Sequence, residues 1–207
     1  MCNLLRADCP DMNLNFIRQL VWLDFRLAVI FTVIIPLILL IWAWQVGVKP
    51  IQRSLIIYWR TASLLAISVF LMIGGLPISF FSGIASRVLI PLALWFWRDL
   101  NEEIAIVRHQ IRPVYHAWRW AVSLYCLGGL TFNLVFANCG LLSQAELYNT
   151  CQVWFEPPLA FQKIFLSFIS TENIVFAGIV GLAVYLLYFA VFLVFNLPKQ
   201  GRIAFRE

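Results

Sequence analysis

Long apolar stretches constrain this chain more than any other feature of its sequence. A helix needs about 20 consecutive apolar residues to cross the roughly 30 Å hydrocarbon layer of a bilayer. Stretches of that length predict spans at about 27–46, 55–74, 77–97, 120–137 and 174–197. The composition agrees, because 62% apolar and 12% charged residues are far from the balance of a soluble domain. The sequence therefore predicts an all-α, polytopic transmembrane bundle.

The number of spans depends on one segment. Residues 54–97 are about twice as long as one span requires, and Gly74-Gly75-Leu76-Pro77 lies near their middle. Glycine and proline together interrupt helices, so this segment is predicted to be a hairpin of two spans. In the alternative it crosses once with a re-entrant piece. Five spans are the central prediction and four are the alternative.

We expect a single domain. The predicted bundle covers residues 27–197, after an N-terminal segment, 1–26, and before a tail, 198–207. Amphipathic patterns outside the spans indicate helices lying at the membrane surface, one within the N-terminal segment and a second over 159–170.

The distribution of Lys and Arg predicts the orientation, because the more positive side normally stays in the cytoplasm. With five spans, one side holds ten basic residues and the other holds four: Arg6, Arg18, Arg26 and Lys163. Four spans also give ten against four. Both arrangements place the 98–119 loop and the C-terminus in the cytoplasm. Because the basic residues lie between apolar runs, anionic lipids are the expected partner and nucleic acid is not.

Arg87 is the most informative single residue, because it falls near the middle of the third predicted span. A guanidinium there costs about 2.5–3.5 kcal/mol on insertion scales. None of the ten acidic residues lies inside an apolar run, so we expect no ion pair within the membrane. One interpretation is a candidate polar site that contacts a lipid phosphate, a cofactor oxygen or a partner's carboxylate. The other is a displaced helix or a side chain that extends toward the headgroups.

The cysteines suggest a disulfide but no metal site. Cys139 and Cys151 lie in the loop assigned to the outside, where a disulfide is the candidate and free thiols are the alternative. Cys2 and Cys9 lie near the N-terminus and Cys126 within a span. Neither a CxxC motif nor a Cys/His zinc pattern occurs, so no metal or other cofactor is evident.

A charged cluster follows the third span in the segment WFWRDLNEE. Its members are Arg98, Asp99, Glu102 and Glu103. Charged runs beside a span usually form a solvated face, and the spacing E-x-x-H of carboxylate-rich metal sites is missing. His109 and His116 follow nearby, with Pro113 between them. An enzyme is disfavoured.

Several segments carry a resemblance to a known family. They are LDFRLAVIFTVIIPLILLIWA, IQRSLIIYWRTASLLAISVFLMIGGLPISF, SRVLIPLALWFWRDLNEE and AWRWAVSLY. The chain resembles a family of small multi-spanning membrane proteins of unknown function from cyanobacteria, with relatives in plastid-bearing eukaryotes. The resemblance covers about residues 20–127 and, more loosely, the rest. It implies a photosynthetic organism and a thylakoid or plasma membrane, and it assigns no role to any residue.

Three functions remain open from the sequence. The leading hypothesis is a non-enzymatic auxiliary or assembly factor of a photosynthetic membrane complex, which binds partners or lipids. The second is a small transporter or channel subunit that uses Arg87 and the kinks at Pro36 and Pro91. The third is a membrane enzyme acting on a lipid-soluble substrate, which would require the cluster at residues 98–103 and the histidines to converge on one pocket.

Overall fold

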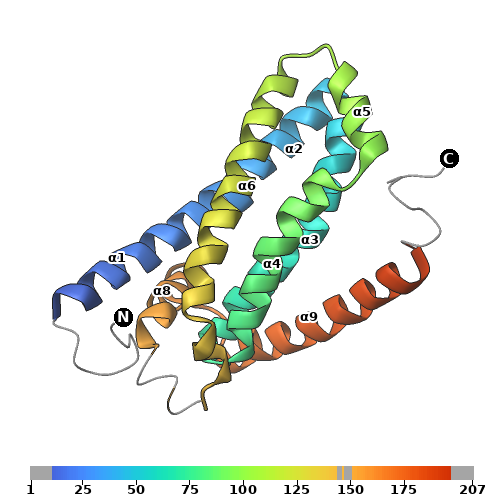
Figure 1. Cartoon of the computed structure of the whole chain (residues 1–207). Coiled ribbons are helices and arrows are strands. Elements are labelled where there is room, and N and C mark those ends of the chain that lie inside the picture. Colours follow the sequence, from blue (N-terminus) through green and yellow to red (C-terminus); the bar gives the residue numbers. More distant parts are fainter. Residues whose placement is uncertain (1–10, 144–145, 147–150, 197–207) are drawn as a thin grey trace.

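In the computed structural model, which describes residues 11–143, 146 and 151–196, every regular element is helical. The elements are α1 (Asp11–Ala28), η1 (Val29–Ile34), α2 (Ile35–Val46), α3 (Lys49–Ile73), α4 (Ile78–Trp95), α5 (Arg98–Ile106), α6 (Ile111–Val135), η2 (Ala137–Leu141), η3 (Gln152–Phe155), α8 (Glu156–Phe165), α9 (Thr171–Val191) and η4 (Phe192–Asn196). The long helices lie side by side in one bundle (Figure 1). The prediction of an all-α bundle is confirmed.

Four helices are long and apolar enough to cross a membrane. They are Leu14–Val46, Lys49–Ile73, Ile78–Trp95 and Thr171–Phe195. The 25-residue helix α6 is also long enough and packs beside α4, but Arg119 and Asn133 make it less apolar. These four helices indicate that the chain is a membrane protein, whereas a fifth span at α6 stays a prediction.

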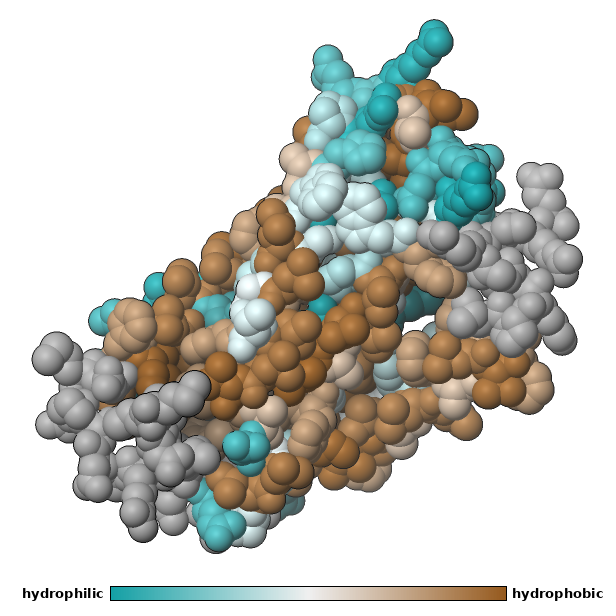
Figure 2. Space-filling view, viewed as in Figure 1, coloured by the Kyte–Doolittle hydropathy of each residue, from teal (hydrophilic) through white to brown (hydrophobic). Residues whose placement is uncertain are grey.

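Two ends of the bundle can be distinguished. The α5 end carries α5 together with the α2–α3 turn, and the α8 end carries the α3–α4 turn, η2, η3 and α8 (Figure 1). Figure 2 shows apolar atoms along the body of the bundle and hydrophilic atoms gathered at the α5 end. The tail, 198–207, lies outside the described residues.

The first helix is one continuous element across α1, η1 and α2. It runs through residues 26 and 27, where the sequence placed the start of the first span, and its part from Leu14 to Val46 has 33 residues. At 1.5 Å per residue that part is about 50 Å long, well beyond one bilayer core. The segment before residue 27 therefore extends the first span and packs against the bundle, with Val21 buried.

A π-helical turn marks the position of the proline in this helix. Pro36 has no N–H, which leaves the carbonyl oxygen of Thr32 without its usual helical partner. The hydroxyl of Tyr58 on α3 donates to that oxygen at 2.7 Å, and the indole N–H of Trp118 on α6 donates to the carbonyl of Phe31 at 2.9 Å. The two side chains fix the irregular turn against α3 and α6.

The hairpin predicted at residues 74–77 lies between α3 and α4. Gly75 has a φ of 62°, a conformation that glycine adopts without the steric cost of a side chain. The N–H of Gly75 donates to the carbonyl of Met72 at 3.0 Å, and Pro77 directly precedes α4. The two helices then pack against each other.

The α8 end is closed by short helices. The predicted surface helix over 159–170 is observed as α8, Glu156–Phe165, which starts earlier because Pro157 and Pro158 occupy its first turn, where proline is tolerated. Glu156 accepts hydrogen bonds from Arg18 at 3.0 Å and Trp22 at 3.3 Å. These bonds attach α8 to α1.

Helix α9 contacts mainly α3 and diverges from the other helices (Figure 1). Gly178 lies against Phe70 and Leu71, and Gly181 lies against Ile67. Small residues at these positions let two helices approach closely. Eight of the remaining α9 side chains are large, apolar and exposed, including Val184 and Leu187.

Candidate functional site

Arg87 lies in the middle of α4 and is only 5% exposed. Side chains on a helix lean toward its N-terminus, so the guanidinium extends toward the α8 end. There it lies between α4, α1 and α6, where it contacts Asp24 and approaches Gly129. The candidate polar point of the sequence is thus an interior position at which three helices meet.

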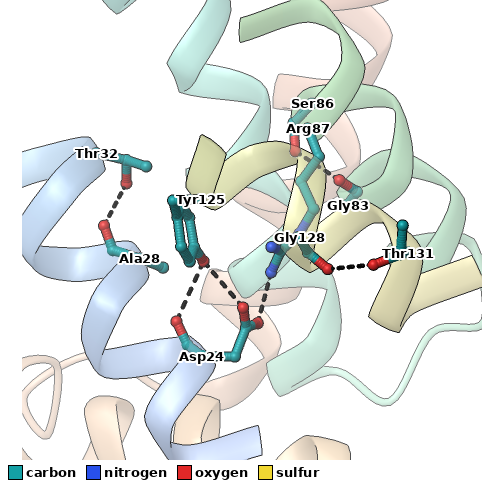
Figure 3. Close-up of polar contacts among 9 residues, drawn as sticks. All are labelled: Asp24, Ala28, Thr32, Gly83, Ser86, Arg87, Tyr125, Gly128 and Thr131. Carbon is teal, nitrogen blue, oxygen red and sulfur yellow. Dashed lines mark hydrogen bonds and ion pairs between the residues drawn. The ribbon is translucent and has the colours of Figure 1, made fainter. Parts of the chain in front are cut away.

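Asp24 on α1 is the counter-ion of Arg87. Nη2 of Arg87 donates to Oδ2 of Asp24 at 2.5 Å, and the hydroxyl of Tyr125 on α6 lies 3.1 Å from both Oδ1 and the backbone carbonyl of Asp24. The guanidinium carbon also lies 5.2 Å from the centre of the Tyr125 ring. Figure 3 shows the three side chains converging from α1, α4 and α6. Both carboxylate oxygens therefore have partners.

The expectation that Arg87 has no acidic partner is wrong. It assumed that only a carboxylate inside an apolar run reaches the level of Arg87. Asp24 precedes the first run by three residues, but the helix is continuous there and carries Asp24 along the bundle. The spacing of Val21, Asp24, Ala28 and Thr32 along one helical face was the available indication.

A glycine provides the space for the guanidinium. A Cβ added at Gly129 of α6 would lie 1.5 Å from Nη1 of Arg87 and 2.6 Å from its Cζ. At the neighbouring Gly128, an added Cβ meets no atom within 4 Å. Gly129 is thus required by the close approach of the Arg87 side chain to the α6 backbone.

The ion pair leaves part of the Arg87 donor capacity unused. Nε and Nη1 are buried and have no hydrogen-bond partner among the described residues. Buried donors without partners are rare in proteins, and each costs about 1–3 kcal/mol. The polar point is therefore electrically neutral as a pair but retains free N–H groups.

An apolar cleft adjoins this point, with a volume of about 470 Å³. It runs between α1 and η1 on one side and α3 on the other, and residues of α4, α6, η3 and α8 complete its wall. Asp24, Arg87 and Asn133 contribute polar groups to a lining that is otherwise mostly aliphatic and aromatic. Ligand pockets in proteins have this size and this balance of groups.

The charged cluster at residues 98–103 lies elsewhere, on α5. Arg98 donates to Glu102 at 2.9 Å within the same helix, and Glu103 lies 3.8 Å from Arg53 of α3. Asp99 lies in the first turn of α5. The lining of the cleft includes none of these four cluster residues, so the enzyme hypothesis finds no common pocket for them there.

The histidines likewise remain apart from the cleft. Nδ1 of exposed His109 accepts a hydrogen bond from the N–H of Ile111 at 3.2 Å, and His116 lies on α6 beside Tyr115. Within the described ranges, no three His, Cys, Asp or Glu residues are grouped so that they could hold a metal ion.

Arg119 is a second buried cation that the sequence analysis assigned to a cytoplasmic loop. It lies within α6, is 2% exposed, and its guanidinium stacks 3.7 Å from the ring centre of Trp95. The indole N–H of Trp95 donates to the hydroxyl of Ser123 at 3.0 Å. Because α6 begins at Ile111, several residues before the predicted span, Arg119 is enclosed by the bundle.

Cys139 and Cys151 form a disulfide at the α8 end. Both cysteines are buried and pack with Phe80 and Trp154. The bond joins η2 to the start of η3 and thereby connects α6 with α8. Cys126 is a buried free thiol, while the N-terminal cysteines lie outside the described residues.

Comparisons with known proteins identify one family. A family model described as "Protein of unknown function (DUF3177)" matches residues 18–205. No curated protein and no solved structure matches the chain.

Proposed function

We propose that this chain, which belongs to the family of proteins of unknown function DUF3177, is a non-enzymatic auxiliary or assembly factor of a photosynthetic membrane complex. Its family carries no assigned activity, so the proposal rests on the site itself. The observation that carries it is the state of Asp24, whose two carboxylate oxygens are engaged by Arg87 and Tyr125. A general acid or base needs a carboxylate that can exchange a proton with a substrate.

The Asp24–Arg87 pair therefore serves to hold three helices together. Breaking a buried ion pair by removing one partner costs about 3–5 kcal/mol, because the other charge is left uncompensated. The pair joins α1, the first part of a continuous helix that is longer than one bilayer core, to α4 and, through Tyr125, to α6. A rigid bundle that exposes apolar surface is suited to binding other membrane components.

Helix α9 supplies the surface that we assign to a partner. It is attached to α3 through Gly178 and Gly181, and its outward side chains include Phe176, Val184 and Leu187. We propose that helices of another membrane-embedded protein pack against this surface. At the α5 end, exposed basic residues such as Lys49 and Arg108 would contact anionic lipid headgroups.

The orientation belongs to the same proposal. The basic residues of the α5 end favour the cytoplasmic or stromal side, and the disulfide at the α8 end favours an oxidising compartment. The two criteria are independent and agree. The C-terminus is then cytoplasmic or stromal, in a thylakoid or plasma membrane of a cyanobacterium or a plastid, as the resemblance of the sequence implies.

Purification in a gentle detergent tests this function. The tagged chain is expressed in a cyanobacterium, and co-purified proteins and pigments are identified. We expect subunits of a pigment-containing complex to co-purify. A protein that runs alone and colourless would contradict the proposal.

A pair of matched variants makes the test specific for α9. Replacing Val184 and Leu187 with alanine alters its exposed face and is expected to reduce the recovered partner. Replacing Leu124 and Leu127 on α6, which are similarly exposed, is the control and should leave recovery unchanged. Equal recovery from both variants would rule out α9 as the docking surface.

A further inference from the structure

Three residues that line the cleft between α1 and α3 carry buried N–H groups that have no acceptor among the described residues. In the described part of the chain, six buried side-chain nitrogen or oxygen atoms have no hydrogen-bond partner. Four of them belong to residues that line the cleft: Nε1 of Trp59, Nε1 of Trp154, and Nε and Nη1 of Arg87. All four are donors. The other two belong to Arg119.

These donors are distributed along the whole cleft. Its wall follows α3 from Trp59 to Met72, a distance of about 20 Å at the rise of an α-helix. Trp154, which is 5% exposed, packs near Met72 at the α8 end, and Trp59 lies at the opposite end. Arg87 contributes to the wall between the elements α1 and α6. The cleft is thus long and apolar, and three residues along its wall hold separate unused donors that a ligand in the cleft would reach through small side-chain rotations.

The cleft is also open toward the membrane. Val33 of η1, and Ser63 and Ala66 of α3, line it and are exposed. In a bilayer these rim residues face acyl chains, so a lipid-soluble molecule can enter sideways between the helices. At the α8 end, the contacts of Glu156 with Arg18 and Trp22 attach α8 across the cleft's end.

We propose that the cleft binds a neutral lipid-soluble molecule with a long apolar chain and carbonyl oxygens as hydrogen-bond acceptors. Because the unused groups are all N–H donors, they favour a ligand that carries several hydrogen-bond acceptors. The charge of Arg87 is already balanced by Asp24, which selects against an anionic headgroup. Ester-linked neutral lipids and isoprenoid quinones share this chemistry. The inference does not depend on the proposed auxiliary function.

Gly83 offers a direct way to block the cleft. It lines the cleft from α4, and a Cβ added there meets no atom within 4 Å. A side chain can therefore begin at Gly83 without displacing packed groups, and Gly83→Leu is designed to occupy the cleft. Gly128→Leu is the matched control, because its Cβ also meets no atom within 4 Å and Gly128 does not line the cleft.

Binding is measured on the full chain in nanodiscs, by native mass spectrometry and by ligand-dependent thermal shift. The probes are dioleoylglycerol, a benzoquinone with a ten-carbon tail, anionic phosphatidylglycerol, and a hydrocarbon of matched length. We expect at least one of the two neutral carbonyl probes to bind at least tenfold more tightly than the hydrocarbon. Which of the two binds identifies the source. Preference for phosphatidylglycerol, or equal binding of the hydrocarbon, would overturn the proposal.

The variants complete the test. Gly83→Leu should weaken binding of the preferred probe at least tenfold, while Gly128→Leu should bind as the wild type does. Trp154→Phe keeps an aromatic ring but removes the N–H donor, and should weaken binding of the carbonyl probe severalfold without changing binding of the hydrocarbon. Unchanged affinity in folded Gly83→Leu would show that the ligand binds elsewhere. Because none of these measurements involves partner proteins, their outcome is separate from that of the purification experiment.

Discussion

The glycine beneath Arg87 allows the central ion pair to be tested without removing either charge. Gly129→Ala adds one methyl group to α6 at 1.5 Å from Nη1 of Arg87 and 3.3 Å from Oδ1 of Asp24. No rotation of the methyl group relieves this overlap, because Cβ is fixed by the backbone. The guanidinium must therefore shift away from α6, and we expect this shift to break its contact with the carboxylate.

The expected cost follows from the loss of the pair. Separating the two charges leaves both buried and costs about 3–5 kcal/mol. The alanine regains about 1 kcal/mol through its higher helix propensity, so the net loss is about 2–4 kcal/mol. For a chain of this size, each kcal/mol shifts the melting temperature by about 2–4 °C. We therefore expect a decrease on the order of 10 °C in detergent.

Gly128→Ala is the control in this experiment. An added Cβ at Gly128 meets nothing within 4 Å, so this variant should be as stable as the wild type or slightly more stable. Thermal unfolding of both variants is followed by circular dichroism or by tryptophan fluorescence. Similar melting temperatures for the Gly128 and Gly129 variants would refute the close approach of Arg87 to α6.

A double-mutant cycle identifies the cause. If the methyl group acts by displacing Arg87, then Gly129→Ala should cost much less in an Arg87→Leu background, since the displaced group is gone. Residues in direct contact commonly show interaction energies of about 0.5–3 kcal/mol in such cycles. Additive effects of the two substitutions would mean that Gly129 matters for a different reason.

Three further predictions concern individual contacts. Asp24→Asn should destabilise the chain by about 3–5 kcal/mol in detergent unfolding, because the guanidinium it pairs with stays buried without a counter-charge; a loss under 1 kcal/mol would contradict the ion pair. Tyr58→Phe should cost about 1–3 kcal/mol by the same measurement, since the carbonyl of Thr32 loses its donor, and an unchanged stability would indicate that this carbonyl is bonded otherwise. Thiol labelling of Cys139 and Cys151 should require prior reduction, and Cys139→Ser should lower stability by about 2–4 kcal/mol; labelling without reductant would exclude the disulfide.

The sequence predicted the features of this fold that depend on local composition. Apolar runs of sufficient length indicated the membrane-crossing helices, and the residues from Gly74 to Pro77 indicated the turn between α3 and α4. The apolar runs and the turn each consist of residues that are adjacent in the sequence, so the sequence alone is enough to predict them. The unusual position of Arg87 was visible for the same reason.

The partners of Arg87 were not predictable in this way. Asp24 and Arg87 are separated by 63 positions, and their contact depends on the extension of the first helix beyond its apolar run. The role of Gly129 depends on how closely α4 approaches α6, which no periodicity encodes. The cleft lies between α1 and α3, and its presence depends on how these two helices separate, which no local pattern of residues encodes.

The 63 positions that separate Asp24 from Arg87 also affect the order in which the helices can enter the membrane. During synthesis, Asp24 leaves the ribosome long before Arg87, while Tyr125 and Gly129 follow later still. An unpaired carboxylate is costly in hydrocarbon, so α1 must wait at the aqueous boundary until α4 is inserted. A nascent chain that stops before α6 has both charges but lacks the recess over Gly129 and the hydroxyl of Tyr125. Full pairing of Asp24 with both Arg87 and Tyr125 thus requires α1, α4 and α6 to be in place together.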